Sequence, residues 1–158
     1  MIQTVFLDID NTLMDFNANA RESMEAAFRE AGLSFREEMF PVFMAVNDRL
    51  WLDIEKGTLT REKLHRIRWG EVFRELDIDF DGEEFEHLFL PQLEVAPPLV
   101  EGALELLEYL YPKYTVCLAS NAPYLQQTRR LAGSGILPYV HKVFISDRKS
   151  TRSELQSR

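Results

Sequence analysis

The chain has 158 residues, a length that suits one domain or a modest core carrying a smaller inserted module. Hydrophobic residues make up 46% of it and aromatic residues 11%, which is enough apolar material for a buried core and excludes wholesale disorder. Its formal net charge of −8 disfavours a nucleic-acid partner, so an anionic substrate would need a local positive site such as a bound metal ion.

The N-terminus has no basic region, and Asp8 interrupts its apolar run. We therefore expect neither a signal peptide nor a membrane span there, and we expect a cytoplasmic protein without a membrane partner. The single cysteine, Cys117, has no partner for an internal disulfide and lies in an apolar run. A small core residue is its favoured interpretation, and a nucleophile is the alternative, which no neighbouring His supports.

The first half of the chain predicts one strand and then only helices. Thr4–Leu7 is a β-branched and apolar run that stops at a cluster of turn-forming residues, which is typical of a buried strand ending in a loop. Apolar residues then recur at helical spacing, with Gly32, Gly57 and Pro91 as stop signals. The predicted helices are Asn19–Ala31, Phe40–Ile54, a helix capped by Thr60 that runs through Phe73, and Gly82–Leu90.

The second half alternates helices with strands. The sequence Ala96-Pro97-Pro98 favours an extended connector and marks a module boundary. Strands that alternate with helices over short loops imply right-handed crossovers and a parallel sheet, so the fold class is α/β. The predicted elements are a helix at Val100–Tyr111, a strand at Tyr114–Ala119, a helix at Tyr124–Gly133 and a strand at Lys142–Ser146.

Two carboxylates follow the first strand. Asp8 and Asp10 lie two residues apart, so both side chains can converge on one point at the carboxyl end of a strand, where α/β sheets bind ligands. Carboxylates that close repel each other unless a divalent cation shares the site, and hard oxygen ligands favour Mg²⁺. The alternative is a simple turn, because Asp and Asn are common turn residues.

The same segment resembles the first motif of the haloacid dehalogenase superfamily, Asp-x-Asp-x-Thr after an apolar strand, and reads Asp8-Ile9-Asp10-Asn11-Thr12. The second motif, a Ser or Thr at the end of the next core strand, matches Val116-Cys117-Leu118-Ala119-Ser120-Asn121. The resemblance implies a Rossmann-like parallel sheet core, incomplete here with about three core strands, and an inserted helical cap that closes over the site. We expect the core at residues 1–15 and 96–147, the cap at 16–95 and a disordered tail at 148–158.

The resemblance also implies a mechanism. Asp8 would attack phosphorus to form an aspartyl-phosphate, and Asp10 would protonate the leaving group and then deprotonate water. Mg²⁺ would be held by the Asp8 carboxylate and the Asp10 backbone carbonyl. Ser120 and the Asn121 backbone N–H would bind the phosphate. An Asp two positions after the nucleophile favours a phosphatase over a dehalogenase.

Within the helical segment, Ala45–Trp51 and Lys56–Thr60 resemble the branch of pyrimidine nucleoside 5′-monophosphate phosphatases with a small helical cap. The resemblance implies a small phosphate monoester, a nucleoside 5′-monophosphate, as the substrate. For Trp51 and Trp69, packing in the cap core is favoured over nucleobase stacking. The three histidines, His65, His87 and His141, fall in no metal-ligand cluster and are interpreted as solvated or packing residues.

The resemblance stops after Asp147. The family continues with a Lys-Pro pair and a later Gly-Asp, which are absent here, and Lys149 lies too near Ser146 to supply the missing lysine. We therefore expect a truncated chain with impaired activity. The first strand, with Val5-Phe6-Leu7, would form an exposed apolar edge that allows self-association.

Two alternative functions remain open. A non-catalytic phosphate-binding or regulatory module of the same fold would explain the missing motifs. A receiver-like domain that accepts phosphate on Asp8 ranks lower, because receivers lack a helical insertion after the first strand.

Overall fold

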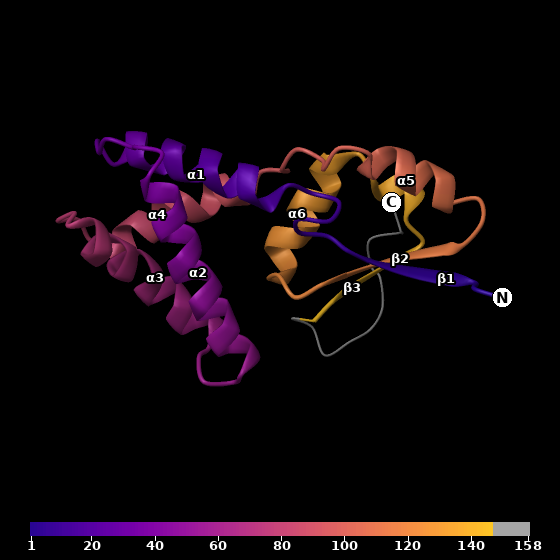
Figure 1. Cartoon of the computed structure of the whole chain (residues 1–158), viewed down its shortest axis with the longest axis horizontal. Helices are drawn as coiled ribbons and strands as arrows, with labels where there is room; N and C mark the ends of the chain where they lie inside the picture. The colour runs from indigo at the N-terminus through magenta and orange to yellow at the C-terminus, as the bar shows by residue number, and fades with distance from the viewer. Residues whose placement is uncertain (147–158) are drawn as a thin grey trace. The chain divides into compact units, whose positions relative to one another are not determined.

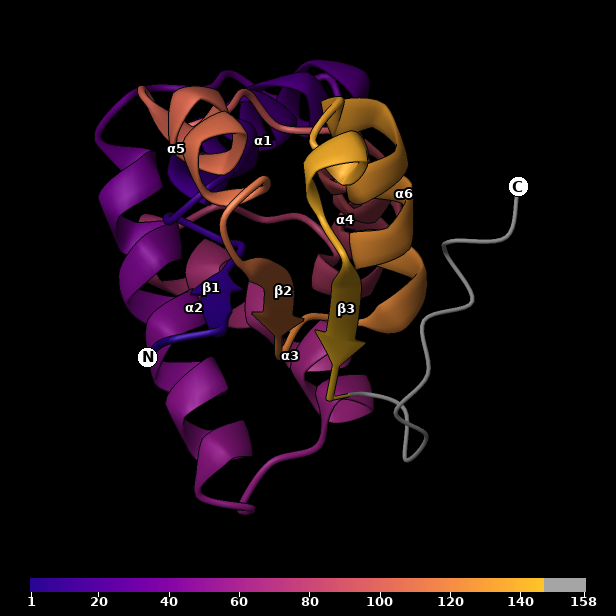
Figure 2. The ribbon, with the colours of Figure 1, turned by 90° about the vertical axis from the view of Figure 1, so that its right-hand side faces the viewer.

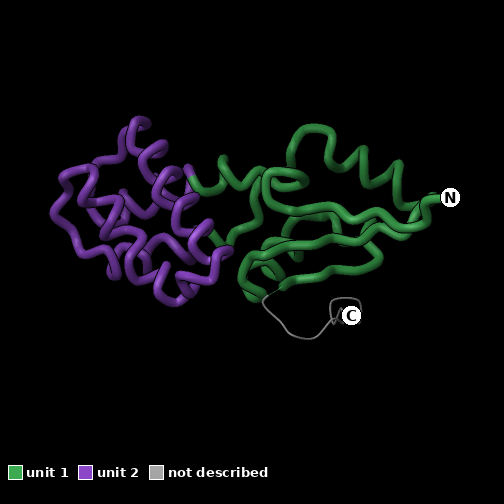
Figure 3. Tube along the Cα trace, turned by 60° about the horizontal axis from the view of Figure 1, so that its bottom comes forward, with its two compact units in different colours: residues 1–20, 93–158 green, residues 21–92 purple. Residues whose placement is uncertain are grey.

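The computed structural model describes residues 1–146, so Asp147 and the predicted tail at 148–158 lie outside the described residues. The chain forms two compact units, which Figure 3 colours separately. Unit 1 comprises Met1–Ala20 and Leu93–Arg158, and unit 2 comprises Arg21–Gln92. An inserted unit therefore interrupts unit 1 after its first strand.

Unit 1 contains a parallel sheet of three strands in the order β1-β2-β3, which confirms the predicted α/β class with three core strands (Figures 1 and 2). The strands are β1 (Thr4–Asp8), β2 (Thr115–Ser120) and β3 (Lys142–Ile145). Helix α5 (Ala103–Leu110) precedes β2, whereas α6 (Tyr124–Ser134) and the short 3₁₀ helix η1 (Leu137–Tyr139) connect β2 to β3.

The core of unit 1 lies between one face of this sheet and its helices. Side chains alternate between the two faces of a strand, so every second residue can point toward the helices. Buried Leu107 of α5 and Leu131 of α6 belong to the same apolar cluster as β2. The strand residues of this cluster are Val5, Leu7, Val116, Leu118 and Val143.

The two connections to unit 2 are hydrogen-bonded to each other within unit 1. The Asp15 N–H donates to the Pro98 carbonyl at 2.9 Å, and the Val100 N–H donates to the Leu13 carbonyl at 3.0 Å. Val100 therefore bonds to a segment distant in sequence and lies outside the helix predicted from it, which begins only at Ala103. Gly102 adopts a left-handed φ of 79° directly before that helix, a conformation that glycine reaches without steric cost.

Unit 2 is built from four helices, which confirms the predicted helical insertion. They are α1 (Phe16–Glu30), α2 (Met39–Glu55), α3 (Arg61–Leu76) and α4 (Gly82–Leu93). The first starts in unit 1, three residues before the prediction, because the Asp15 carboxylate accepts from the Ala18 N–H at 2.9 Å. The prediction that Pro91 ends the fourth helix is wrong. Pro91 lies in the last turn, where the carbonyl of exposed His87 can be hydrated instead.

None of the described helices combines the length and apolar composition that crossing a bilayer requires.

Aromatic rings fill the interior of unit 2. Trp69 is fully buried, and its ring centroid lies 4.3 Å from that of Phe85 and 5.1 Å from that of Phe43. Such tilted and offset pairs stabilise a core beyond the area they bury. Trp69 is therefore a core residue of unit 2, in line with the favoured interpretation.

An ion pair is also buried in unit 2. Arg68 and Glu86 are almost inaccessible, and the Glu86 carboxylate accepts from Arg68 Nη2 at 2.6 Å. Arg68 Nη1 donates to Asn47 Oδ1 at 3.0 Å, and His65 Nδ1 lies 2.7 Å from Glu86 Oε1. The buried charge of Arg68 is thus compensated by that of Glu86, which offsets the cost of removing both from water. His65 is therefore a packing residue that contacts the carboxylate of this ion pair.

Gly82 lets the start of α4 approach the backbone of α3 closely at Gly70. A Cβ on Gly82 would lie 2.3 Å from the Gly70 backbone nitrogen, whereas a Cβ on Gly70 meets nothing within 4 Å. We predict that Gly82→Ala lowers the free energy of unfolding by about 2 kcal/mol, because backbone must move to relieve the overlap. Gly70→Ala should raise it by about 1 kcal/mol through helix propensity. Urea unfolding of both variants checks this, and equal shifts would contradict the close approach.

Strand β1 is the edge of the described sheet on the side opposite β3. The Thr115 N–H donates to the Gln3 carbonyl, so alternate residues of β1 face β2. The backbone groups of Phe6 therefore point outward, and its side chain is 61% exposed although its ring packs 5.7 Å from that of Phe144. An apolar edge of this kind can pair with another strand.

We predict concentration-dependent self-association through this edge, which Phe6→Lys should weaken because a charged edge residue opposes pairing of strands. Val95→Lys is the matched control, because Val95 is also 61% exposed but lies outside the sheet. Sedimentation velocity over a range of concentrations measures the effect. Equal behaviour of the two variants would exclude β1 as the interface.

Candidate active site

The pairing of β1 with β2 positions the residues singled out from the sequence. Asp8 ends β1 opposite Ala119, Ser120 ends β2, and Asn121 follows directly. Parallel neighbours end at the same edge of a sheet, so these residues lie at one edge of unit 1. Their chemical roles remain predictions at this point.

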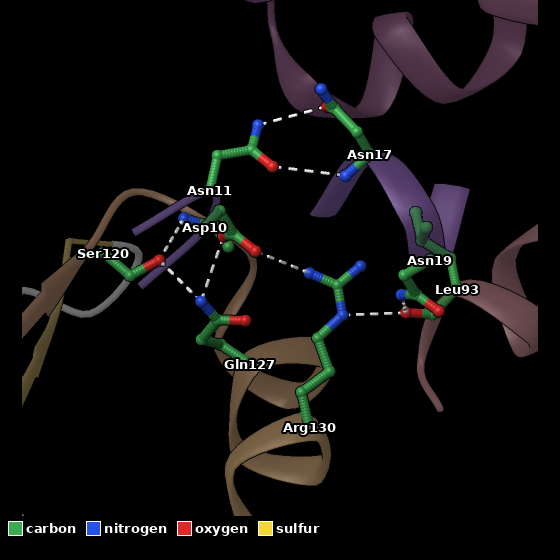
Figure 4. Close-up of polar contacts among 9 residues, drawn as sticks. Asp10, Asn11, Asn17, Asn19, Leu93, Ser120, Gln127 and Arg130 are labelled. Carbon is green, nitrogen blue, oxygen red and sulfur yellow. Dashed lines mark hydrogen bonds and ion pairs between the residues drawn. The ribbon is translucent and has the colours of Figure 1, made fainter. Parts of the chain in front are cut away.

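A tight loop after β1 holds Asp10. The carbonyl of buried Ile9 accepts from the Leu13 N–H at 2.9 Å and the Met14 N–H at 3.0 Å. Asn11 adopts a left-handed φ of 58°, which Asn tolerates better than most residues. Its side chain exchanges two hydrogen bonds with Asn17, at 3.1 and 3.2 Å (Figure 4). The loop is thus defined by its own hydrogen bonds.

Two residues of α6 bind the two oxygens of the Asp10 carboxylate (Figure 4). Gln127 Nε2 donates to Oδ2 at 3.1 Å, and Arg130 Nη1 donates to Oδ1 at 3.2 Å. Sequence reasoning missed both residues. Their spacing of three places them on one helix face, but the sequence did not indicate which face of α6 meets the site.

Ser120 joins the same network. Its Oγ accepts from Gln127 Nε2 at 3.1 Å and from the Ala122 N–H at 3.1 Å. Gln127 therefore bridges Asp10 and Ser120, which the sequence had placed on separate strand ends. Asn121 is exposed at the start of the following turn.

Arg130 is 1% exposed and is held on several sides. Its Nε donates to the Leu93 carbonyl at 2.8 Å, which also accepts from Asn19, and its guanidinium lies 5.6 Å from the Phe16 ring centroid. Nη2 has no hydrogen-bond partner within the described part of the chain. Burial lowers the pKa of Arg130, and Asp10 opposes this shift.

Burial raises the pKa of Asp10 above its ordinary value, and the nearby Asp8 carboxylate adds to the rise. The charge of Arg130 and the Gln127 hydrogen bond act in the opposite direction without cancelling it. The protonated form of Asp10 is therefore favoured relative to an exposed aspartate, as a carboxyl group that donates a proton requires.

A magnesium ion fits the oxygen atoms at this edge in part. The Asp8 side chain is exposed and supplies a carboxylate, while Arg130 and Gln127 occupy the Asp10 carboxylate and leave its backbone carbonyl as a ligand. Among residues 1–146 there is no group of three or more His, Cys, Asp or Glu side chains arranged to hold a metal. Mg²⁺ would therefore keep several waters, as it commonly does.

The family model for haloacid dehalogenase-like hydrolases matches residues 2–155. The chain belongs to this family, in agreement with the resemblance of its two motifs.

Three curated relatives are 26–28% identical to this chain over the aligned residues. The protein YfnB of Bacillus subtilis, described as a HAD-hydrolase, is 26% identical over 145 residues, which are 92% of this chain and 62% of YfnB. The pyrimidine 5′-nucleotidase PynA of Streptococcus pneumoniae is 28% identical over 94% of this chain and 63% of its own length. The pyrimidine 5′-nucleotidase YjjG of Escherichia coli is 27% identical over 90% and 62%. The chain thus spans less than two thirds of each relative.

Solved structures match the same fold. A magnesium-bound crystal structure of Bacillus subtilis YfnB superposes with a TM-score of 0.85 at 25% identity, over 92% of this chain and 66% of that one. The L-2-haloacid dehalogenase of Xanthobacter autotrophicus superposes with a TM-score of 0.67 at 18% identity, over 93% and 58%. The second match concerns the fold alone.

We predict that Arg130→Met lowers the free energy of unfolding by about 2–3 kcal/mol, because a half-buried carboxylate loses its charged partner and the Leu93 carbonyl loses one of its two donors. Arg129→Met is the control, since exposed Arg129 pairs with Glu94 at the surface and its loss should cost less than about 1 kcal/mol. Chemical unfolding of the two variants measures the difference. Similar losses would show that Arg130 is not a structural anchor.

Proposed function

We propose that the site belongs to a Mg²⁺-dependent phosphatase that hydrolyses small phosphate monoesters through an aspartyl-phosphate on Asp8. One arrangement carries this proposal: an exposed carboxylate, Asp8, ends β1, and at the same end of the sheet a half-buried carboxylate and a hydroxyl, Asp10 and Ser120, are joined by one amide. Membership of the hydrolase family supports it.

In the first step, an Asp8 carboxylate oxygen attacks phosphorus, and the bond from phosphorus to the ester oxygen breaks. The Asp10 carboxyl gives its proton to the departing alkoxide, a transfer that its held orientation and its half-buried position favour. Ser120 and the Asn121 N–H stabilise the charge on the phosphoryl oxygens.

In the second step, the Asp10 carboxylate takes a proton from water, and the resulting hydroxide attacks the phosphorus of the aspartyl-phosphate. The bond between phosphorus and the Asp8 oxygen breaks, which frees Asp8 and releases inorganic phosphate. A bound Mg²⁺ supplies positive charge against the phosphoryl oxygens and offsets the repulsion between Asp8 and the substrate.

We propose a nucleoside 5′-monophosphate as the substrate. Two relatives at 27–28% identity are named as pyrimidine 5′-nucleotidases, which supports this choice. The net charge of −8 disfavours a nucleic-acid polymer and fits a small anion that binds at a single local site.

A second candidate is a non-catalytic phosphate-binding module of the same fold. The lack of a cluster of three metal-binding side chains within residues 1–146 favours it, because few fixed ligands would hold the ion. Calorimetry with Mg²⁺ and uridine monophosphate separates the two candidates, since binding without phosphate release supports the module.

We predict that the chain releases phosphate from uridine monophosphate with Mg²⁺ and that Asp8→Asn lowers the rate by about a thousandfold or more, because the nucleophile is lost. Asp79→Asn is the control, because Asp79 is an exposed carboxylate between α3 and α4 and should leave the rate unchanged. A colorimetric phosphate assay measures both. Equal rates for wild type and Asp8→Asn would refute the nucleophile.

A further inference from the structure

Gln127 is the one side chain that contacts both Asp10 and Ser120 among the hydrogen bonds of the site. It is a polar residue with no accessible surface, and α6 holds it at the strand ends. A buried amide is expected to have specific partners. Its two N–H bonds go to Asp10 Oδ2 and Ser120 Oγ, each at 3.1 Å (Figure 4).

The chemistry of the partners fixes the orientation of this amide. Oε1 has no hydrogen-bond partner within the described part of the chain. Rotating the amide by half a turn would place Oε1 against the Asp10 carboxylate, where two acceptors repel each other. The N–H side must therefore face Asp10 and Ser120.

This orientation sets the direction of the Ser120 hydroxyl. A hydroxyl oxygen can accept two hydrogen bonds and donate one. The Oγ atom of Ser120 already accepts two, from Gln127 Nε2 and from the Ala122 N–H. With both acceptor positions of Oγ in use, Ser120 can bind a further group only by donating its hydroxyl proton. An anionic oxygen requires such a donor.

The same residue restricts the Asp10 carboxylate. With Gln127 on Oδ2 and Arg130 on Oδ1, both oxygens are held from one face of α6. Rotation of the carboxylate would break at least one of these bonds, and the network between Asp10 and Ser120 would be lost with it.

We propose that Gln127 is a positioning residue whose single amide orients the Asp10 carboxylate and forces the Ser120 hydroxyl to donate to an oxygen of bound phosphate. This inference rests on the proposed function, because phosphate is the ligand it invokes. The contacts of the Gln127 amide are with the side chains of Asp10 and Ser120. It acts only through its two neighbours.

A double-mutant cycle on the full chain tests the proposal, with calorimetric titration of inorganic phosphate in Mg²⁺ as the readout. Gln127→Leu and Ser120→Ala should each weaken phosphate binding by about tenfold, the scale of one hydrogen bond to a charged group. In the Ser120→Ala background, Gln127→Leu should change the dissociation constant by less than about twofold, because its effect passes through the hydroxyl.

Gln126→Leu provides the matched control. This neighbouring glutamine is also buried, and the same change there should leave phosphate affinity unchanged. Gln127→Glu keeps the size of the side chain but presents an anion to Asp10, so it should weaken binding at least as much as Gln127→Leu. Gln127→Met replaces Gln127→Leu in the cycle if the leucine variant does not fold by circular dichroism.

Two results would overturn the proposal in different ways. If the wild type binds phosphate and the two substitutions act additively, Gln127 does not act through Ser120, while the proposed phosphatase function stands. If the wild type neither binds phosphate nor releases it from monoesters, the proposed function fails and this inference fails with it.

Discussion

Parallel pairing of β1 with β2 is the constraint on which the site depends. The register places Asp8 opposite Ala119. Two segments more than a hundred residues apart in sequence therefore end side by side at the carboxyl ends of their strands. Parallel strands require a long crossover, which here includes the whole of unit 2. A slip of one residue would turn the Ser120 side chain to the other face and separate it from Gln127.

Helix α6 supplies the residues that hold the polar side chains at the strand ends in place. The strand ends supply the carboxylates and the hydroxyl, while Gln127 and Arg130 determine how they are oriented. Arg130 also fixes residue 93, where the chain returns from unit 2, through the Leu93 carbonyl. The buried charge of Arg130 is compensated by Asp10, so the stability of unit 1 and the geometry of its site share one ion pair.

The strands, the helical segment and the positions of Asp8, Asp10, Ser120 and Asn121 at strand ends followed from local patterns. Thr4–Leu7 and Tyr114–Ala119 are short apolar runs ending in polar residues, and that pattern needs no tertiary information.

Gln127 and Arg130 could not be found in this way, because the rotation of α6 about its axis depends on packing by Leu131 and its neighbours. The late start of α5 was missed for a similar reason, since Val100 bonds to Leu13, which is distant in sequence. Pro91 shows that a stop signal is weak in a last turn whose carbonyls reach water.

The hydrogen bonds between Leu13–Asp15 and Pro98–Val100 have a consequence for how the chain tolerates change. They join the segment that leads into the insertion to the segment that returns from it. For unit 1, the residues between these two segments are therefore a closed loop. The entropy of closing a loop grows only with the logarithm of its length. Lengthening, shortening or exchanging the inserted segment should therefore perturb unit 1 little, which makes this junction a natural place for graft and deletion.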